Sequence, residues 1–418
     1  MTLPIPTTLG LKKSFGFGDR LGLATPGHLA AARKSDFAPI FAQQSIREMD
    51  RTQRTPQEVM LAAQKALAHA GYSQEWGADA DHLKTEADVN ITAATGYCFF
   101  TIDPSGLVVN DADTMSPALL VEQVAHLLRD GVFTDTHWAE HYLNQTFEVS
   151  DKTTLRFDQD GLYRAAAKYA RAIAHCEKMT HAIAKASASR PYEIEVSVDE
   201  SDSPTSALEH LFFGLELKRR GVHVVSLAPR FVGDFEKGID YRDDLKAFED
   251  CLQKHVEVAK YCGPYKLSIH SGSDKFSVYP IIGRVCENLV HVKTAGTSYL
   301  EALRVVCRKS PDLFSEIVQF SVQRFNLDRK SYHISTTELD VVDLAKKPTS
   351  DPERVYLEER VGRQLLHVTF GSVLTLGKAR NGRSFKEAIL ELLNREKDLY
   401  AEVLEIHFTK HLSLLNAG

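Results

Sequence analysis

Short runs in which apolar and polar residues alternate recur along the chain, and each run ends in polar residues before a helical pattern begins. Residues 192–201 (YEIEVSVDES) and 265–274 (YKLSIHSGSD) show this alternation clearly. A period of two predicts a β-strand with one apolar face, and strands that alternate with helices predict a mostly parallel sheet. The predicted strands are residues 19–28, 76–84, 97–105, 192–201, 222–230, 265–274, 289–296 and 365–374.

The number of these runs bears on the architecture of the sheet. Eight strands, each followed by a helix, favour a closed (β/α)8 TIM barrel, in which polar residues collect at the C-terminal rim. An open doubly wound sheet is compatible with the same composition. Capping-box patterns predict that helices begin at residues 55–58, 206–209 and 298–301.

Three segments do not fit simple strand–helix connections. Residues 104–191 and 310–364 are too long and are rich in helical patterns, so we expect two helical insertions, after the third and seventh strands of one domain spanning 1–418. The first would form a cap over the barrel mouth. Residues 377–418 have the pattern of amphipathic helices. They either pack on the barrel or form a subunit contact in a homo-oligomer, and the pattern does not distinguish the two.

Strand parity sorts the side chains of each predicted strand. In residues 192–200, Ile194, Val196 and Val198 form the apolar face, so the acidic residues between them are expected to face the barrel interior. The same alternation turns ionisable side chains inward from other strands, whereas it directs His82 away. The inward set includes Asp79, Asp81, Glu195, Asp199, Lys266, His270, His291, Lys293 and His367.

These inward charges have two interpretations. A buried charge without a partner costs several kcal/mol, so the charges either pair with one another in an internal network or hold a metal or a charged ligand. We favour a site at the barrel mouth, because the polar residues gather at strand C-terminal ends. Carboxylate and imidazole together suit Zn²⁺, Mn²⁺ or Ni²⁺. The candidate metal ligands are Asp199, Glu200, His270 and His291, and Asp81 and Asp103 are candidate ligands or general bases.

Basic residues and free backbone N–H groups near the same rim predict a site for a carboxylate or phosphate group of the substrate. TAGTSY (294–299), for example, joins a strand to a predicted helix start. The candidate substrate-binding residues are Arg230, Ser271, Ser273, Lys275, Thr297, Ser298 and His367. No GxGxxG motif at a strand-to-helix turn and no GxxxxGK[ST] motif is present, so no nucleotide cofactor is expected, and FGFGD (15–19) is interpreted as a turn.

Composition narrows the class of protein further. The 418-residue chain has a net charge of −6 and no run of basic residues, which argues against a nucleic-acid partner. No apolar stretch approaches the roughly 18 residues that span a membrane. The N-terminal residues lack a signal-peptide pattern and the 6 cysteines are scattered, so we expect a cytoplasmic protein with a small-molecule substrate.

Several long strings resemble the tagaturonate/fructuronate epimerase family of hexuronate catabolism (UxaE type). They are VSVDESDSPTS, VVSLAPRFVGDFEKGIDY, YKLSIHSGSDKFSVYP, HVKTAGTSYLEALR and LLHVTFGSVL. The similarity extends over most of the chain and is clearest from about 192 to 374. It implies a metal-dependent barrel enzyme that interconverts D-tagaturonate and D-fructuronate.

The chemistry that the resemblance implies can be matched to the candidate residues. The two ketouronates differ at a carbon β to the ketone, which favours retro-aldol cleavage and re-addition over removal of an α-proton. Asp81 is the first candidate for the base and Asp103 the second. Lys293 would neutralise an oxyanion, and Arg230 and Lys275 would clamp the uronate carboxylate. Transient oxidation by a nicotinamide cofactor is an alternative route.

Two other classes of protein remain open at this stage. One is a different metal-dependent barrel enzyme that acts on sugar acids, either an aldose–ketose isomerase or an aldolase. The other is a barrel protein that binds sugar acids without turnover. A panel of substrates distinguishes them, because an isomerase moves the carbonyl group, an aldolase releases two fragments, and a binding protein does neither.

Overall fold

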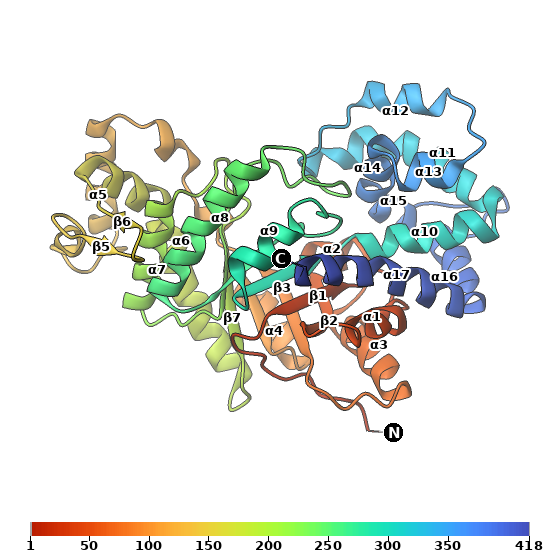
Figure 1. Cartoon of the computed structure of the whole chain (residues 1–418), viewed down its shortest axis with the longest axis horizontal. Coiled ribbons are helices and arrows are strands. Elements are labelled where there is room, and N and C mark those ends of the chain that lie inside the picture. Colours follow the sequence, from red (N-terminus) through yellow and green to blue (C-terminus); the bar gives the residue numbers. More distant parts are fainter. Residues whose placement is uncertain (1, 418) are drawn as a thin grey trace.

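The strands close into a barrel of eight parallel members in the order β1-β10-β9-β8-β7-β4-β3-β2 (Figure 1). The computed structural model describes residues 2–417. The barrel strands are β1 (Ser14–Gly18), β2 (Ala38–Ser45), β3 (Gly77–Leu83), β4 (Phe99–Ile102), β7 (Glu193–Ser197), β8 (Ser226–Ala228), β9 (Lys266–Ile269) and β10 (Val290–Thr294). The predicted (β/α)8 barrel is therefore confirmed.

Six of the eight predicted strands overlap barrel strands, and two predictions are wrong. Residues 19–28 form a loop and the start of helix α1 (Thr25–Ala32), while residues 365–374 form the end of α14 (Arg360–Val368) and most of α15 (Phe370–Thr375). A short apolar run such as LLHVTF does not distinguish a buried helix from a strand.

The strands that the prediction missed are β1 and β2. The FGFGD segment was interpreted as a turn because of its glycines, yet it forms β1 and closes the barrel. A Cβ atom on Gly16 would lie 2.4 Å from Gln43 Oε1, and one on Gly18 would lie 2.5 Å from the Thr294 carbonyl oxygen. These glycines therefore mark close approach of neighbouring groups within a strand.

Helices surround the barrel and bury its apolar outer face. They are α1, α2 (Ile46–Thr52), α3 (Pro56–His69), α4 (Glu86–Ala94), α7 (Ala207–Arg219), α8 (Leu245–Cys262), α9 (Tyr279–Cys286) and α10 (Thr297–Lys309). The capping boxes predicted at Thr55 and Ser206 are present. The one predicted at Ser298 is not, because α10 begins at Thr297 and the Ser298 hydroxyl lies 2.8 Å from His28 Nε2.

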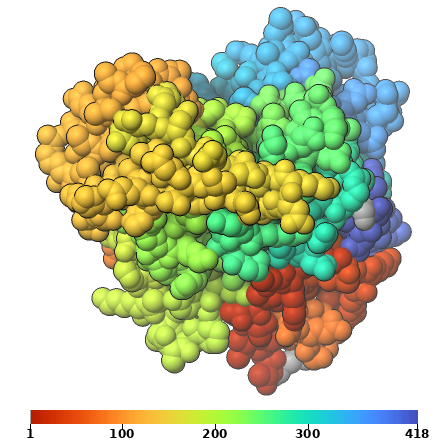
Figure 2. Space-filling view, turned by 60° about the vertical axis from the view of Figure 1, so that its left-hand side comes forward, coloured from red at the N-terminus to blue at the C-terminus, as the bar shows by residue number. Residues whose placement is uncertain are grey.

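Residues 104–191 form a mostly helical segment between β4 and β7, so by the observed order it follows the fourth barrel strand. It contains η1 (Ser105–Leu107), η2 (Asn110–Thr114), α5 (Pro117–Arg129), η3 (Trp138–His141), α6 (Gln159–Ser187) and the hairpin of β5 (Phe147–Glu148) and β6 (Thr154–Leu155). Figure 2 shows its orange and yellow part as a lobe on one side of the molecule. Lys168 of α6 bonds Asp113, Ser203 and Glu209, which ties this segment to the loop after β7.

The chain after β10 is helical as far as it is described. Residues 310–364 were expected to lie between the last two strands. They instead follow the last barrel strand, so this prediction is wrong. The helices after α10 are α11 (Pro311–Asp328), η4 (Arg329–Ser331), α12 (Glu338–Ala345), α13 (Pro352–Leu357), α14, α15, α16 (Phe385–Arg395) and α17 (Lys397–Asn416). The last of them, α17, packs against α1 and α9. Among the described helices, none is both long and apolar enough to cross a membrane.

Candidate active site

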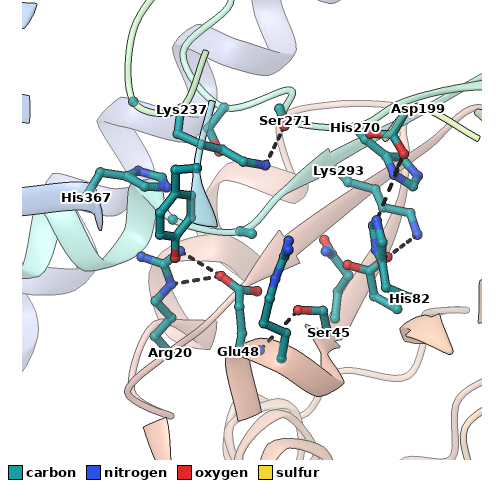
Figure 3. A pocket seen from close by; sticks show the side chains of 18 of the residues that line it. Arg20, Ser45, Glu48, His82, Asp199, Lys237, His270, Ser271, Lys293 and His367 are labelled. Atoms are coloured by element: carbon teal, nitrogen blue, oxygen red, sulfur yellow. Dashed lines mark hydrogen bonds and ion pairs between the residues drawn. The ribbon is translucent and has the colours of Figure 1, made fainter. Parts of the chain in front are cut away.

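A polar pocket opens at the C-terminal ends of the barrel strands (Figure 3). Side chains from most of the strand ends and from the C-terminal helices converge on it. They include Arg20, Gln43, Ser45, Glu48, Asp81, His82, Asp199, Glu200, Lys237, His270, Ser271, Ser273, Lys293, Tyr332 and His367. The fold thus brings together polar residues that lie more than 300 positions apart in the sequence, such as Arg20 and His367.

Two imidazoles and one carboxylate at this pocket could hold a metal ion. Ligand atoms of His82, Asp199 and His270 all lie within 4.8 Å of one another. Asp199 Oδ1 is 3.3 Å from His270 Nδ1 and 4.0 Å from His82 Nε2. Three such donors around one point fit Zn²⁺, Mn²⁺ or Ni²⁺ with room for further oxygen ligands.

The hydrogen bonds behind these imidazoles support the same interpretation. His82 Nδ1 donates to Asp81 at 2.8 Å, and His270 Nε2 donates to Glu195 at 2.8 Å. Each ring is thereby oriented so that its other nitrogen faces Asp199. A carboxylate behind a histidine is the usual support of a metal-ligating ring.

Lys293 holds these supporting carboxylates together. Its ammonium group lies 2.7 Å from Asp79, 2.7 Å from Asp81 and 2.8 Å from Glu195, and it also donates to Thr101. Burial alone would lower the pKa of Lys293, but the three carboxylates raise it well above its usual value. Its N–H donors are therefore engaged within the barrel.

The carboxylates of Asp199 and Glu195 make the cluster of His82, Asp199 and His270 attractive to a cation. Burial disfavours a charged imidazole, yet Asp199 and Glu195 together raise the pKa of His270 to about 10. Burial is likewise outweighed at Asp199, where His270 and His82 hold the pKa of the carboxyl well below its usual range. A divalent cation would take the place of the proton that this environment favours.

A cationic region lies across the pocket from this cluster (Figure 3). Lys237 extends from the loop after β8 and donates to the Ser271 hydroxyl, and burial lowers its pKa. Arg20 donates from Nε and Nη2 to Glu48 at 3.0 and 2.6 Å. His367 completes the region from α14, and burial together with Arg20 lowers its pKa well below the usual value. This side of the pocket suits an anionic group of a ligand.

Several buried polar atoms of the pocket have no hydrogen-bond partner within residues 2–417. They are Arg20 Nη1, His367 Nδ1 and both side-chain polar atoms of Gln43. Buried polar groups are nearly always satisfied. These atoms therefore mark where a polar, anionic ligand would form hydrogen bonds.

The structure does not bring all of the predicted site residues to the pocket. His291 lies inside the barrel with its Nδ1 3.0 Å from the Ser14 hydroxyl, and burial lowers its pKa to about 3. Asp103 pairs with Lys84 at 3.2 Å. Thr297 bonds His407, and Ser298 bonds His28. Neither His291 nor these other three residues lines the pocket.

Three further predicted residues lie near the pocket but make other contacts. Glu200 is at its edge, 3.3 Å from Arg47, and is not part of the two-histidine cluster. Arg230 lines an adjoining cavity and donates to the Ser201 carbonyl oxygen. Lys275 is fully buried within the loop after β9, where its Nζ donates to backbone carbonyls.

Comparisons with known proteins identify the family of the chain. Residues 1–415 match the family model described as tagaturonate epimerase (UxaE). The chain belongs to the tagaturonate epimerase family. A family member from Thermotoga maritima, named tagaturonate/fructuronate epimerase, is 42% identical over 410 residues, which are 98% of this chain and 82% of that protein.

Solved structures of this epimerase family share the fold. The native crystal structure of fructuronate-tagaturonate epimerase UxaE from Cohnella laeviribosi is 37% identical, has a TM-score of 0.90, and is matched over 98% of this chain and 83% of that one. Its two-glycerol complex is 36% identical with a TM-score of 0.92, over 99% and 83%. The family resemblance expected from the sequence is thus confirmed.

The sequence analysis missed four side chains that line the pocket of this tagaturonate epimerase family member, those of His82, Arg20, Gln43 and Lys237. His82 was expected to point away by strand parity, but its left-handed backbone (φ 55°) breaks the alternation and turns the ring into the pocket. Gln43 lies in the unrecognised strand β2 and Lys237 in a long loop, so no periodicity assigned a direction to their side chains, and Arg20 lies in residues 19–28, which were expected to form a strand but form a loop after β1. An inspection of every polar residue at a strand end would have found His82.

Gly296 leaves room for His367 in this pocket. A Cβ atom at Gly296 would lie 2.1 Å from His367 Cε1. We expect Gly296→Ala to displace the imidazole and lower kcat/KM by about 10²-fold, since misplacement by about 1 Å has effects of this size. Steady-state kinetics would measure this, with Gly106→Ala as control, because a Cβ there meets no atom within 4 Å. Equal activity of both variants would exclude a role for the His367 position.

Proposed function

We propose that the protein is a divalent-metal-dependent epimerase that interconverts D-tagaturonate and D-fructuronate by retro-aldol cleavage and re-addition. The observation that carries the proposal is Asp199 between two carboxylate-supported histidines, with a cationic region across the same pocket. This arrangement can engage both ends of a ketouronate. The names of the family and of its members supply the substrates.

His82, Asp199 and His270 would hold the metal, because their free donor atoms converge and their other atoms are already bonded. When bound, the metal would supply Lewis-acid stabilisation of negative charge on the ketone side of the substrate. Asp81 and Glu195 orient the two rings. Lys293 balances the charge of these carboxylates, a different role from the oxyanion contact expected from the sequence.

The uronate carboxylate would lie at the cationic side of the pocket. Lys237 has only the Ser271 hydroxyl as a hydrogen-bond partner in residues 2–417, and Arg20 Nη1 has none there. A carboxylate between them would satisfy both cations and raise the pKa of Lys237 that burial lowers. The ketone and its neighbouring hydroxyl would then face the Asp199 cluster.

The reaction also requires a group of the protein that accepts one proton from the substrate and returns it. A base takes the proton from the hydroxyl on the inverting carbon, the bond from that carbon to its neighbour breaks, and the electron pair forms an enediolate beside an aldehyde. The aldehyde turns its other face, the bond forms again, and the base returns the proton. Asp81 is committed to His82 and Lys293, which hold its pKa well below its usual range against the effect of burial. We assign the proton transfer to His367, whose imidazole is neutral and whose Nδ1 is unpartnered within residues 2–417.

The proposal is tested by treating the protein with chelator and following D-tagaturonate by NMR in D₂O, with and without Mn²⁺, Ni²⁺ or Zn²⁺. We expect D-fructuronate only with metal, and no deuterium at the inverting carbon, because that C–H bond never breaks in a retro-aldol route. Turnover without metal would exclude the metal role. Deuterium at the inverting carbon would exclude retro-aldol cleavage, and a shifted carbonyl or accumulating three-carbon fragments would indicate an isomerase or an aldolase.

A further inference from the structure

A second group of one carboxylate and two imidazoles lies behind the pocket. Ligand atoms of Asp274, His407 and His411 lie within 4.8 Å of one another, as in the first group. Asp274 belongs to the loop after β9, and the histidines are one turn apart on α17. By composition alone, this group would be a second metal site.

The contacts of this group differ from those of the first in a decisive way. Arg363 Nη2 already occupies Asp274 Oδ2 at 2.7 Å. His411 Nε2 accepts the Asp274 backbone N–H at 3.0 Å, while its Nδ1 donates to the His407 carbonyl oxygen at 2.9 Å. The lone pair that a metal would need is therefore in use, and a guanidinium stands where the cation would bind. His407 Nε2, 3.0 Å from Asp274 Oδ1, satisfies the other carboxylate oxygen.

Three of the segments linked to Asp274 carry groups of the cationic side of the pocket. Arg363 Nε donates to the Gly238 carbonyl at 2.6 Å, next to Lys237, and Arg363 lies one helical turn before His367. Thr297, whose hydroxyl is 3.3 Å from Asp274 Oδ1, follows Gly296. Asp274 itself is three residues from Ser271.

The loop that carries Asp274 contains two residues in an unfavourable backbone conformation, which contacts with the surrounding segments must stabilise. Both Ser271 (φ 53°) and Asp274 (φ 62°) have left-handed conformations, which non-glycine residues rarely adopt. The neighbouring Lys275 also joins this loop to the loop after β8, through the carbonyls of Glu236 and Ile239 at 2.8 and 2.5 Å. Two adjacent residues thus fix the β9 loop against the loop that carries Lys237.

We propose that Asp274 is a positioning residue for substrate binding, and that His407, His411 and Arg363 hold it without binding metal. Through these contacts the C-terminal helix α17 sets the places of Lys237, Ser271 and His367. This inference rests on the proposed function, because those three groups are the ones assigned to the uronate carboxylate and the proton. It adds that helix to the determinants of substrate affinity.

The test is Asp274→Asn in the full chain, which keeps the side-chain size and removes the charge that Arg363 and His407 bind. We expect KM for D-tagaturonate to rise about 10-fold or more while kcat changes less, because the contact to the uronate is loosened in ground and transition state alike. Bound metal should remain at one equivalent per chain in both proteins. Hydrogen exchange of peptides covering 236–240 and 270–276 should become faster.

A matched control is Glu216→Gln on the outer helix α7. Glu216 is as buried as Asp274, accepts from Tyr142 and pairs with Arg219, but does not line the pocket. Glu216→Gln should lower the stability of the protein without changing KM or the rate of hydrogen exchange in residues 236–240 and 270–276. If Asp274→Asn does not fold, Arg363→Lys is the second variant. It keeps the positive charge but loses the several hydrogen bonds of the guanidinium group, and it should raise KM in the same way.

Other results would overturn the proposal. An unchanged KM in Asp274→Asn and Arg363→Lys would show that the contacts are structural only. Two equivalents of metal in the wild type, falling to one in Asp274→Asn, would show a second metal site. If the wild type does not epimerise the ketouronate, the proposed function fails, while metal content and hydrogen exchange still decide the role of Asp274.

Discussion

Asp199→Asn is expected to abolish binding of the divalent metal at ordinary concentrations and to lower kcat/KM for D-tagaturonate by at least about 10³-fold. Asp199 is the one carboxylate of the cluster, 3.3 Å from His270 and 4.0 Å from His82. An amide carries no charge to offset the metal cation, and loss of metal-ion catalysis is worth several kcal/mol of transition-state stabilisation. Metal analysis after dialysis and steady-state kinetics would measure both effects.

The matched control for this variant is Glu200→Gln, the same type of change at the next residue. Glu200 was expected from the sequence to be a ligand, but it lies beside Arg47 outside the cluster. It should keep its metal, so the pair of variants tests the ligand set itself. Metal retained in Asp199→Asn and lost in Glu200→Gln would reverse the assignment.

Lys237→Met is expected to lower kcat/KM for D-tagaturonate by about 10²-fold, mostly through KM. Lys237 is a buried ammonium whose hydrogen-bond partner among the described residues is one hydroxyl, so its charge is available to the substrate. A hydrogen bond to a charged group contributes about 1.5–3 kcal/mol, which corresponds to roughly this change. Methionine keeps the length and the apolar stem of the side chain.

The measurement should include D-tagatose, which lacks the carboxylate. The wild type should prefer the uronate strongly, and Lys237→Met should lose most of that preference while its low activity on D-tagatose stays the same. Arg230→Met is the control, because Arg230 was the sequence-based candidate for this contact but donates to the Ser201 carbonyl in an adjoining cavity. A larger loss in Arg230→Met than in Lys237→Met would assign the carboxylate to Arg230.

The sequence predicted most of the fold because barrel strands are strongly patterned. Six strands with apolar alternation or apolar runs between helices were recognised, and the closed barrel was expected from eight predicted strands, of which these six are correct. The strand β1 was missed because it contains two glycines, which close packing requires. The strand β2, with the sequence APIFAQQS, was missed as well. The apolar run at 365–374 was mistaken for a strand because it is buried within helices on every side.

What the sequence by itself determined is the (β/α)8 class, the resemblance to the epimerase family, and a site at the strand C-termini with Asp199 and His270 facing inward. The fold class and the site follow from local periodicity, which parallel strands share at one rim of the barrel, whereas the resemblance rests on several long strings of sequence. Only the tertiary structure decided the rest of the site. His82 turns inward through a left-handed residue, His291 is held by Ser14 below the pocket, Lys237 comes from a loop, and His367, which was expected at the site on a strand, reaches it from a helix. Such placements depend on contacts between segments far apart in the chain, which a local pattern does not record.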